Sequence, residues 1–192
     1  MVSIFTPLPY ELTVNGQKYK LTPWFDNVLA MYERIEDLDE WDKPEVMLHY
    51  LLKNPPKKVS ISLLRAVTNV LFKPSSGGGE KTFDFVQDSE LIYSAFYQAY
   101  GIDLIEQQGK LHWWKFSSLL NGLPSDTRFS EIVSIRTRPI PAPTKYNQQE
   151  RTNLIQMKQK YALKLTSKER EEQLQSSLRQ VVNWLQSAAK GK

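Results

Sequence analysis

Apolar residues recur along most of this chain at the spacing of helices, and only a short stretch near the N-terminus alternates in the manner of strands. The stretch 8–22 predicts a β-hairpin, because Asn15 and Gly16 form a two-residue turn in which both positions tolerate positive φ. An isolated hairpin is marginal in water, so we expect one face of it to lie on helices. Counting outward from the turn gives that face two apolar pairs: Leu12 with Tyr19, and Tyr10 with Leu21.

Residues that favour helix starts and stops divide the chain between 22 and 138. Thr22 precedes Pro23 as an N-cap, Asp42 forms a capping box with Glu45, and Gly101 supplies a left-handed stop. The sequence predicts helices after Thr22, from Asp42 to Pro55, after Ser60, over about 88–100 and 110–121, and after Thr127.

These patterns predict a mainly α protein: a multi-helix domain with a short N-terminal β-hairpin and a C-terminal helical extension. Residues 1–138 form the hairpin and the helical body, interrupted by a flexible linker over 74–82 that contains three consecutive glycines. Three prolines make residues 139–144 a stiff spacer, where we place the domain boundary. Residues 145–192 form a basic helical C-terminal segment.

The C-terminal segment contains two predicted helices, over about 147–163 and from Thr166, whose capping partner is Glu169. The second helix has an apolar stripe that needs a partner, either the body of this chain or another chain. We expect 145–192 to be more mobile than the body, or ordered only by packing on another chain. The stripe comprises Leu174, Leu178, Val181, Val182 and Leu185.

The densest aromatic cluster, Trp113, Trp114 and Phe116, allows two main interpretations. A broad apolar arc on one helix is typical of a core helix, which we favour, whereas tryptophans on a surface are typical of binding hot spots. Basic residues do not interleave densely enough for base stacking. The candidate partner-binding residues are Trp113, Trp114, Phe116, Leu174, Leu178, Val181 and Leu185.

Composition narrows the classes of function. With 41% hydrophobic residues the chain supports a core, and the absence of cysteine excludes disulfides and thiolate metal sites. We expect no secretory signal and no membrane span. Residues 1–138 hold 15 Lys/Arg against 17 Asp/Glu, whereas 139–192 hold 10 against 4. This basic end favours a solvated helical face over a nucleic-acid-binding patch, although a nucleic-acid-binding regulator stays open as an alternative.

Candidate chemistry is sparse. His49 and His112 are the only histidines, too few for a convincing metal site, and the acidic run 36–42 lacks the spacing of a calcium loop. Capping of a helix explains Asp88 better than acid–base chemistry does. We therefore predict no catalytic residues, no metal and no cofactor, and expect that the protein is not an enzyme.

Four stretches together resemble a known family: LPYELTVNGQKYKL (8–21), TFDFVQDSELIYSAFYQAYGIDL (82–104), KLHWWKFSSLLNGLPSDTRFSEIVSIRTR (110–138) and LIQMKQKYAL (154–163). They resemble tail-module proteins of tailed phages and prophages of Gram-positive bacteria, which look like tail assembly chaperones. The combination of YGIDL, LHWWKF and a helix ending in IRTR carries the resemblance.

The resemblance implies a non-enzymatic role in tail morphogenesis. Such chaperones bind the long, helical tape-measure protein in the host bacterial cytoplasm, are displaced by tail-tube protein, and are absent from the mature virion. The tape-measure protein is thus the expected partner, with tail-tube protein or a second copy of this chain as further partners. We expect no membrane partner, and a nucleic-acid partner is the less favoured alternative. The main alternative is a structural tail or connector component that stays in the virion.

Overall fold

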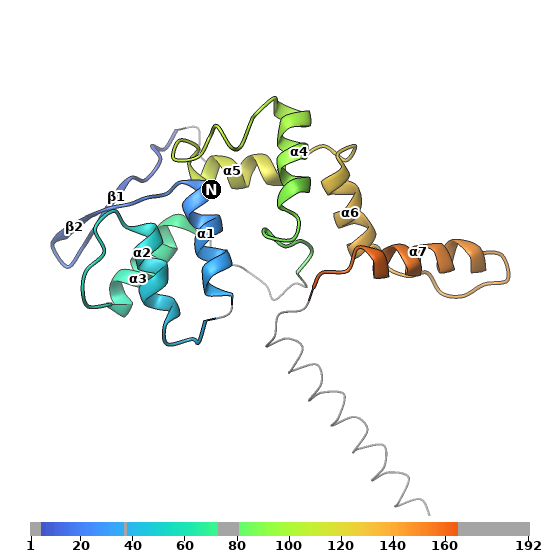
Figure 1. Ribbon diagram of the computed structural model, residues 1–192, viewed down its shortest axis with the longest axis horizontal. Coiled ribbons are helices and arrows are strands. Elements are labelled where there is room, and N and C mark those ends of the chain that lie inside the picture. Colours follow the sequence, from blue (N-terminus) through green and yellow to red (C-terminus); the bar gives the residue numbers. More distant parts are fainter. Residues whose placement is uncertain (1–4, 37, 73–80, 165–192) are drawn as a thin grey trace, which may run out of the picture.

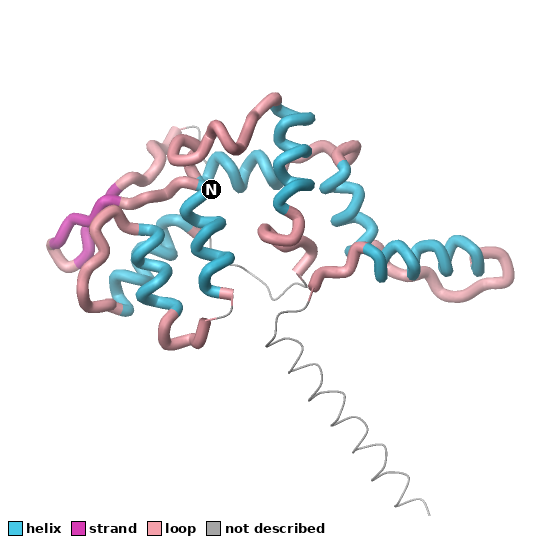
Figure 2. Tube along the Cα trace, viewed as in Figure 1, coloured by secondary structure: helices cyan, strands magenta, loops and turns pink. Residues whose placement is uncertain are grey.

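The computed structural model describes residues 5–36, 38–72 and 81–164, and these residues fold as a mainly α protein with an N-terminal hairpin, as predicted (Figures 1 and 2). The hairpin and the first three helices lie together at one side of the molecule, and α4 to α7 follow toward the other side (Figure 1). In chain order the elements are β1 (Glu11–Val14), β2 (Gln17–Lys20), α1 (Phe25–Ile35), α2 (Lys43–Leu51), α3 (Ile61–Leu71), α4 (Ser89–Tyr100), α5 (Trp113–Asn121), α6 (Arg128–Thr137) and α7 (Gln148–Lys160).

The hairpin has the predicted register. Asn15 and Gly16 take φ values of 50° and 78°, and Leu12 lies opposite Tyr19. The Lys53 amide donates to the Lys20 carbonyl at 2.9 Å, which ties the end of β2 to the chain just after α2. Strand β1 also contacts α3. The expectation that the hairpin lies against helices is therefore confirmed.

The predicted N-cap at Thr22 is wrong. Helix α1 begins at Phe25 with Trp24 in the N-cap position, and the Thr22 hydroxyl instead donates to the Tyr50 carbonyl at 2.6 Å. Thr22 therefore joins the end of the hairpin to α2. Asp42 and Ser60 do occupy the N-cap positions of α2 and α3, but neither side chain makes the capping hydrogen bond.

Helix α5 begins later than the sequence predicts, at Trp113 and not near Lys110. The reason is tertiary: His112 forms an antiparallel bridge with Trp24, and the Trp113 amide donates to the Pro23 carbonyl at 2.7 Å. These pairings hold His112 in an extended conformation, so the helix begins only at Trp113. Two other predicted helix ends are confirmed, since Gly101 ends α4 at a φ of 64° and the Thr127 side chain caps α6.

The core centres on Phe116, whose side chain is fully buried. Its ring stacks on Phe25 from α1 and on Phe96 from α4, with centroids 5.0 Å apart in both cases. Three helices distant in sequence therefore meet at one aromatic residue of α5.

Helix α7 returns to the body after the proline-rich stretch 139–144. It packs on α6, where Leu154 is buried, and otherwise projects from the molecule (Figure 1). The domain boundary at 139–144 and the greater mobility of the C-terminal segment stay predictions. Most of the predicted linker 74–82 and all of the second C-terminal helix lie outside the described residues.

Candidate functional site

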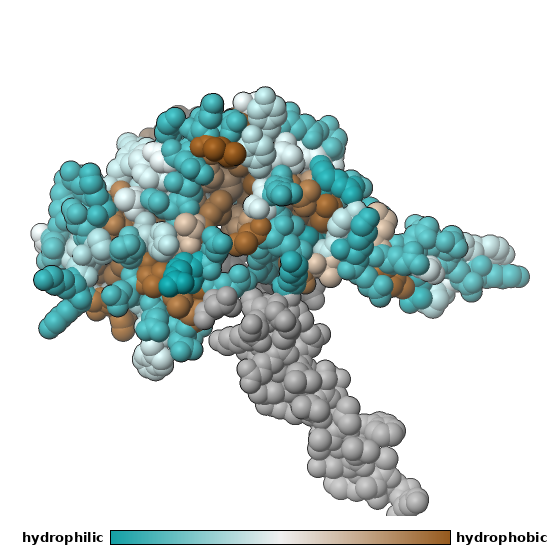
Figure 3. Space-filling model, viewed as in Figure 1, coloured by the Kyte–Doolittle hydropathy of each residue, from teal (hydrophilic) through white to brown (hydrophobic). Residues whose placement is uncertain are grey.

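The candidate site is an apolar depression between the C-terminal half of α1 and the segment that leads into α4. We call it the aromatic groove; its volume is about 540 Å³. Apolar side chains gather in the hollow between α1 and the beginning of α4 (Figure 3). Its apolar lining comprises Tyr32, Ile35, Phe83, Phe85 and Val86, and its polar lining comprises Glu36, Lys43, Lys81, Thr82 and Asp84.

Aromatic rings form the floor of the groove. Tyr32 stacks on Phe85 with centroids 5.5 Å apart, and Phe83 meets Phe85 edge-on at 5.1 Å. Trp113 lies beneath them, 5.9 Å from Phe85 and 6.3 Å from Tyr32. Tyr32 and Val86 keep 36% and 45% of their surface exposed, so the groove offers apolar area to a partner while its floor is supported by the core.

The rim of the groove carries both signs of charge. The Lys81 ammonium lies 2.5 Å from an Asp84 carboxylate oxygen and 3.9 Å from one of Glu36. Desolvation works to raise the pKa of Asp84, but the hydrogen bond and charge of Lys81 and two backbone amides outweigh it and hold that pKa below 3.8. Desolvation also raises the pKa of Tyr32 above 10.0, so its ring carries no charge at neutral pH.

Asp84 shapes the segment that carries Phe85 and Val86. One of its carboxylate oxygens accepts from the Val86 amide at 2.8 Å and from the Gln87 amide at 2.7 Å. The Asp84 amide in turn donates to the Asp88 carboxylate at 3.0 Å. This turn fixes the apolar side chains between the two aspartates in place.

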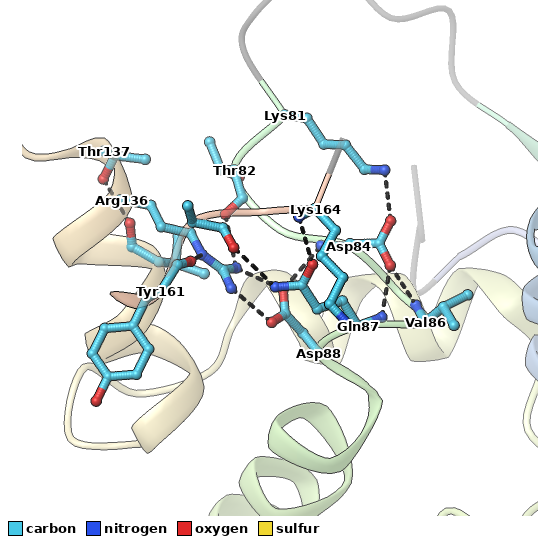
Figure 4. Close-up of polar contacts among 12 residues, drawn as sticks. Lys81, Thr82, Asp84, Val86, Gln87, Asp88, Arg136, Thr137, Tyr161 and Lys164 are labelled. Carbon is cyan, nitrogen blue, oxygen red and sulfur yellow. Dashed lines mark hydrogen bonds and ion pairs between the residues drawn. The ribbon is translucent and has the colours of Figure 1, made fainter. Parts of the chain in front are cut away.

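Arg136 anchors the same turn from α6 (Figure 4). Its two terminal nitrogens donate to the two oxygens of Asp88 at 2.6 and 2.9 Å, and its Nε donates to the Tyr161 carbonyl at 2.6 Å. The side chains of Arg136 and Asp88 are only 9% and 2% exposed. One guanidinium therefore joins α4, α6 and the end of α7 at a buried point behind the groove.

The end of the described chain also lies at this point. The Gln87 side-chain amide donates to the Ala162 carbonyl at 3.1 Å, and the Gln87 carbonyl oxygen accepts from the Lys164 amide at 2.8 Å. Lys164 is thus held at the Gln87 side chain (Figure 4), and neither of these two residues lines the groove.

The residues predicted to bind a partner differ in how far the structure buries them, and four of them lie outside the described residues. Trp113 and Phe116 are 7% and 0% exposed and belong to the core, so a partner does not reach them in this conformation. Trp114 is half-buried, and its indole N–H donates to the Leu71 carbonyl at 2.9 Å. The remaining candidates, Leu174, Leu178, Val181 and Leu185, lie outside the described residues. Partner binding through any of these seven stays a prediction.

His112 has a structural role at the start of α5. The side chain is 1% exposed, its Nδ1 accepts from the Trp114 amide at 3.0 Å, and its Nε2 lies 3.2 Å from the Pro9 carbonyl. Nε2 therefore carries the proton of a neutral imidazole. Burial lowers the pKa of His112 below 6.5.

Two buried or partly buried aspartates, Asp88 and Asp103, have structural partners. Asp88 does not cap α4 as expected, because its carboxylate is engaged by Asp84 and Arg136. Asp103 accepts from the Ile105 amide at 2.9 Å and from the Tyr93 hydroxyl at 3.2 Å. Across the described ranges, no three His, Asp or Glu side chains are placed to hold a metal ion, and no helix is long and apolar enough to cross a membrane.

A larger hollow of about 880 Å³ lies between α6 and α7. Ile135, Leu154 and Met157 contribute apolar surface, but serine, asparagine, glutamate and arginine side chains make up much of the rest of its lining. It lacks the continuous aromatic floor of the groove, so we favour the groove as the candidate site.

The sequence alone did not identify this groove. Tyr32 is one of several apolar residues at helical spacing, and Phe85 lies in a stretch without regular spacing. The two are 53 positions apart, so nothing in the sequence pairs them. Arg136 was part of the IRTR pattern, but nothing in the sequence paired it with Asp88. The cluster of three phenylalanine or valine positions in TFDFVQD was the available signal.

Fold and site together describe a mainly helical protein with an open apolar groove and structural roles for its buried polar groups. Residues 5–163 match the family model described as "Bacteriophage Gp15 protein", which covers most of the chain. The chain belongs to this family of bacteriophage proteins, and the match spans the proline-rich stretch and α7. No curated protein and no solved structure matches it significantly.

Proposed function

We propose that this protein is a tail assembly chaperone, a non-enzymatic binding protein that engages the phage tape-measure protein during tail morphogenesis. Membership of a bacteriophage family supports a role in the phage, and the resemblance of the YGIDL, LHWWKF and IRTR stretches to tail-module proteins supports the tail. On this proposal it acts in the host bacterial cytoplasm and is absent from the mature virion.

The aromatic groove is the observation that carries the proposal. Tape-measure proteins are long and helical, and a helix binds a groove through apolar side chains spaced by one turn. Tyr32 and Val86 are exposed enough to receive such side chains, and the stacked rings below them give a rigid floor. Because Glu36 and Lys81 carry opposite charges, the rim does not favour either an acidic or a basic partner.

An open groove also suits a chaperone that must dissociate from its partner before the tail is complete. Tail-tube subunits can displace it only if each contact is modest, and many weak sites along a long partner still give strong overall binding. A single groove of about 540 Å³ with a charged rim fits that requirement better than a deep enclosed pocket would.

Co-expression with the tape-measure protein of the same phage tests the proposal. We expect the tape-measure protein to become more soluble and to co-purify with this chain. Mass spectrometry of purified virions tests the alternative, a structural tail or connector component, because a chaperone is missing from finished particles. Failure of co-purification, or a stoichiometric presence in virions, contradicts the proposal.

A further inference from the structure

We propose that copies of this chain associate head to tail, with the projecting arm that carries α7 in one copy lying on the exposed Trp41 loop of the next copy. We call residues 138–164 the basic arm and residues 38–45 the acidic corner. This contact is additional to the proposed function and does not depend on it. Four features support it: the shape of the arm, the exposed tryptophan of the corner, the opposite charges of the two surfaces, and their places in the fold.

Prolines hold the first part of the basic arm in an extended shape. Every residue from Arg138 to Pro143 either is a proline or precedes one, and both positions favour the polyproline II conformation. Arg138 has φ −57° and ψ 127°, which lies within the usual scatter of that conformation. Helix α7 braces the stretch, because the Arg151 Nε donates to the Pro141 carbonyl at 3.2 Å. The arm therefore loses little conformational freedom when it binds a partner.

The extended stretch presents an apolar ridge to solvent. Ile140 and Pro143 are three positions apart, which is one turn of a polyproline II helix, so they lie on the same side of it. Both are exposed, Ile140 by 44%, and neither lines the hollow between α6 and α7. Proline-rich stretches of this kind are recognised by aromatic side chains. The ridge therefore suits a partner that offers an exposed aromatic ring.

The acidic corner supplies such a ring. Trp41 is 93% exposed in the connection between α1 and α2. Tryptophan is among the residues that contribute most to binding where an interface buries them. In the head-to-tail contact the indole of Trp41 covers the ridge of Ile140 and Pro143, so apolar surface of both copies is removed from water.

The charges of the two surfaces are opposite. The basic arm contains six Lys or Arg residues against one glutamate, whereas the acidic corner contains four Asp or Glu residues against one lysine. That lysine, Lys43, pairs with Glu40 at 2.8 Å, so three further carboxylates leave the corner negative. Opposite charges steer the arm of one copy to the corner of another, and like charges disfavour contacts of arm with arm or of corner with corner.

The two surfaces lie apart in the fold. The acidic corner connects α1 to α2, whereas the basic arm projects beyond α6, away from these helices (Figure 1). The arm of one copy therefore meets the corner of a different copy. A contact between two different surfaces of identical chains gives a ring where the rotation closes and an open row where it does not.

Sedimentation velocity of the full-length chain over a range of concentrations tests the contact. In about 0.1 M salt we expect association that increases with protein concentration, and in about 1 M salt, where screening is stronger, we expect it to weaken. A chain that stays monomeric at every concentration overturns the proposal and leaves both surfaces to other partners. Association that does not respond to salt also overturns it.

Trp41→Ser tests the apolar part of the contact. It removes a ring from an exposed loop and leaves the buried core intact, and we expect the dissociation constant of self-association to rise at least about tenfold. The matched control is Tyr97→Ser, which removes an aromatic side chain that is 59% exposed on α4 and should associate like the natural chain. Equal dissociation constants for the two variants overturn the proposal.

Charge reversal distinguishes the head-to-tail contact from a contact between like surfaces. Asp39→Lys/Glu45→Lys reverses two exposed charges of the corner, and Arg138→Glu/Lys145→Glu reverses two of the arm. We expect each variant alone to stay monomeric where the natural chain associates. An equal mixture should regain association, because one variant supplies a natural arm and the other a natural corner.

A mixture that stays monomeric overturns the proposal, and so does a variant that associates as strongly as the natural chain. Circular dichroism of each variant verifies that the fold is retained. The assay contains no tape-measure protein, so its outcome is separate from that of the proposed function.

Discussion

Arg136 and Asp88 form a buried, two-pronged ion pair across 48 positions of sequence, with nitrogen–oxygen distances of 2.6 and 2.9 Å. The same guanidinium reaches the Tyr161 carbonyl, and the Lys158 ammonium donates to the Arg136 carbonyl. This pair therefore positions three features at once: the start of α4, the turn that walls the groove, and the end of the described chain after α7.

Breaking this pair should destabilise the whole fold. Asp88→Asn leaves the Arg136 charge buried without its counter-ion, and we expect a loss of about 3–5 kcal/mol in the free energy of unfolding measured in urea. The double variant Asp88→Leu/Arg136→Met removes both charges and should recover part of that loss.

The matched control is the exposed pair of Arg128 and Glu131, whose side chains are each 49% exposed. Glu131→Gln should change the unfolding midpoint very little, since water solvates the remaining guanidinium, which also keeps its hydrogen bond to the Tyr161 hydroxyl. A loss for Glu131→Gln as large as that for Asp88→Asn would show that burial of the Asp88 pair adds nothing to its effect on stability.

His112 should make stability depend on pH. Its pKa is lowered in the folded chain from an ordinary 6.5, so above pH 6.5 both folded and unfolded chains hold it neutral and its contribution is complete. As the pH falls below 6.5 the unfolded chain takes up the proton first, and stability declines until the lower folded pKa is passed. Protonation also fills Nδ1, which otherwise accepts from the Trp114 amide.

Urea unfolding between pH 7.5 and 5 measures this effect. In His112→Asn the side-chain oxygen can still cap α5, since asparagine is a favoured N-cap, but the group no longer titrates. The variant should therefore show a flatter decline with falling pH than the natural chain. Identical slopes would show that other groups cause the decline.

Phe116→Ala tests the core beneath the groove. The fully buried ring stacks on Phe25 and Phe96, so its removal leaves a cavity, and we expect a loss of about 3–5 kcal/mol in unfolding free energy. Tyr97→Ala, at a side chain 59% exposed on α4, is the control and should cost far less. A loss for Phe116→Ala no larger than that of the control would contradict the placement of α5 at the centre of the core.

Local signals in the sequence were enough to predict the hairpin and several helix ends. Asn15 and Gly16 determine a turn by backbone geometry alone, and Gly101 and Thr127 act within one turn of their own helices. The predictions failed where a residue far away in the sequence takes the hydrogen bond that a local cap would make. Thr22 has the character of an N-cap, yet its hydroxyl is used by the Tyr50 carbonyl 28 residues away.

The site was less predictable than the fold, because it too depends on contacts between residues that are distant in the sequence. The aromatic cluster at Trp113 was visible, and its burial agrees with the core interpretation that the apolar arc favoured. The groove above it depends on Tyr32 meeting Phe85 and on Arg136 meeting Asp88, and both contacts arise only when α1, α4 and α6 are packed together. Neither contact has a signature in local spacing.

The most direct measurement of the central claim is the affinity of groove variants for the tape-measure protein. Val86→Asp places a charge on an exposed groove wall, whereas Ile105→Asp places the same charge on an exposed loop outside it. Both variants should fold, as circular dichroism can verify. The account predicts that Val86→Asp loses co-purification with the tape-measure protein while Ile105→Asp retains it; equal retention by both variants would contradict the groove as the binding site.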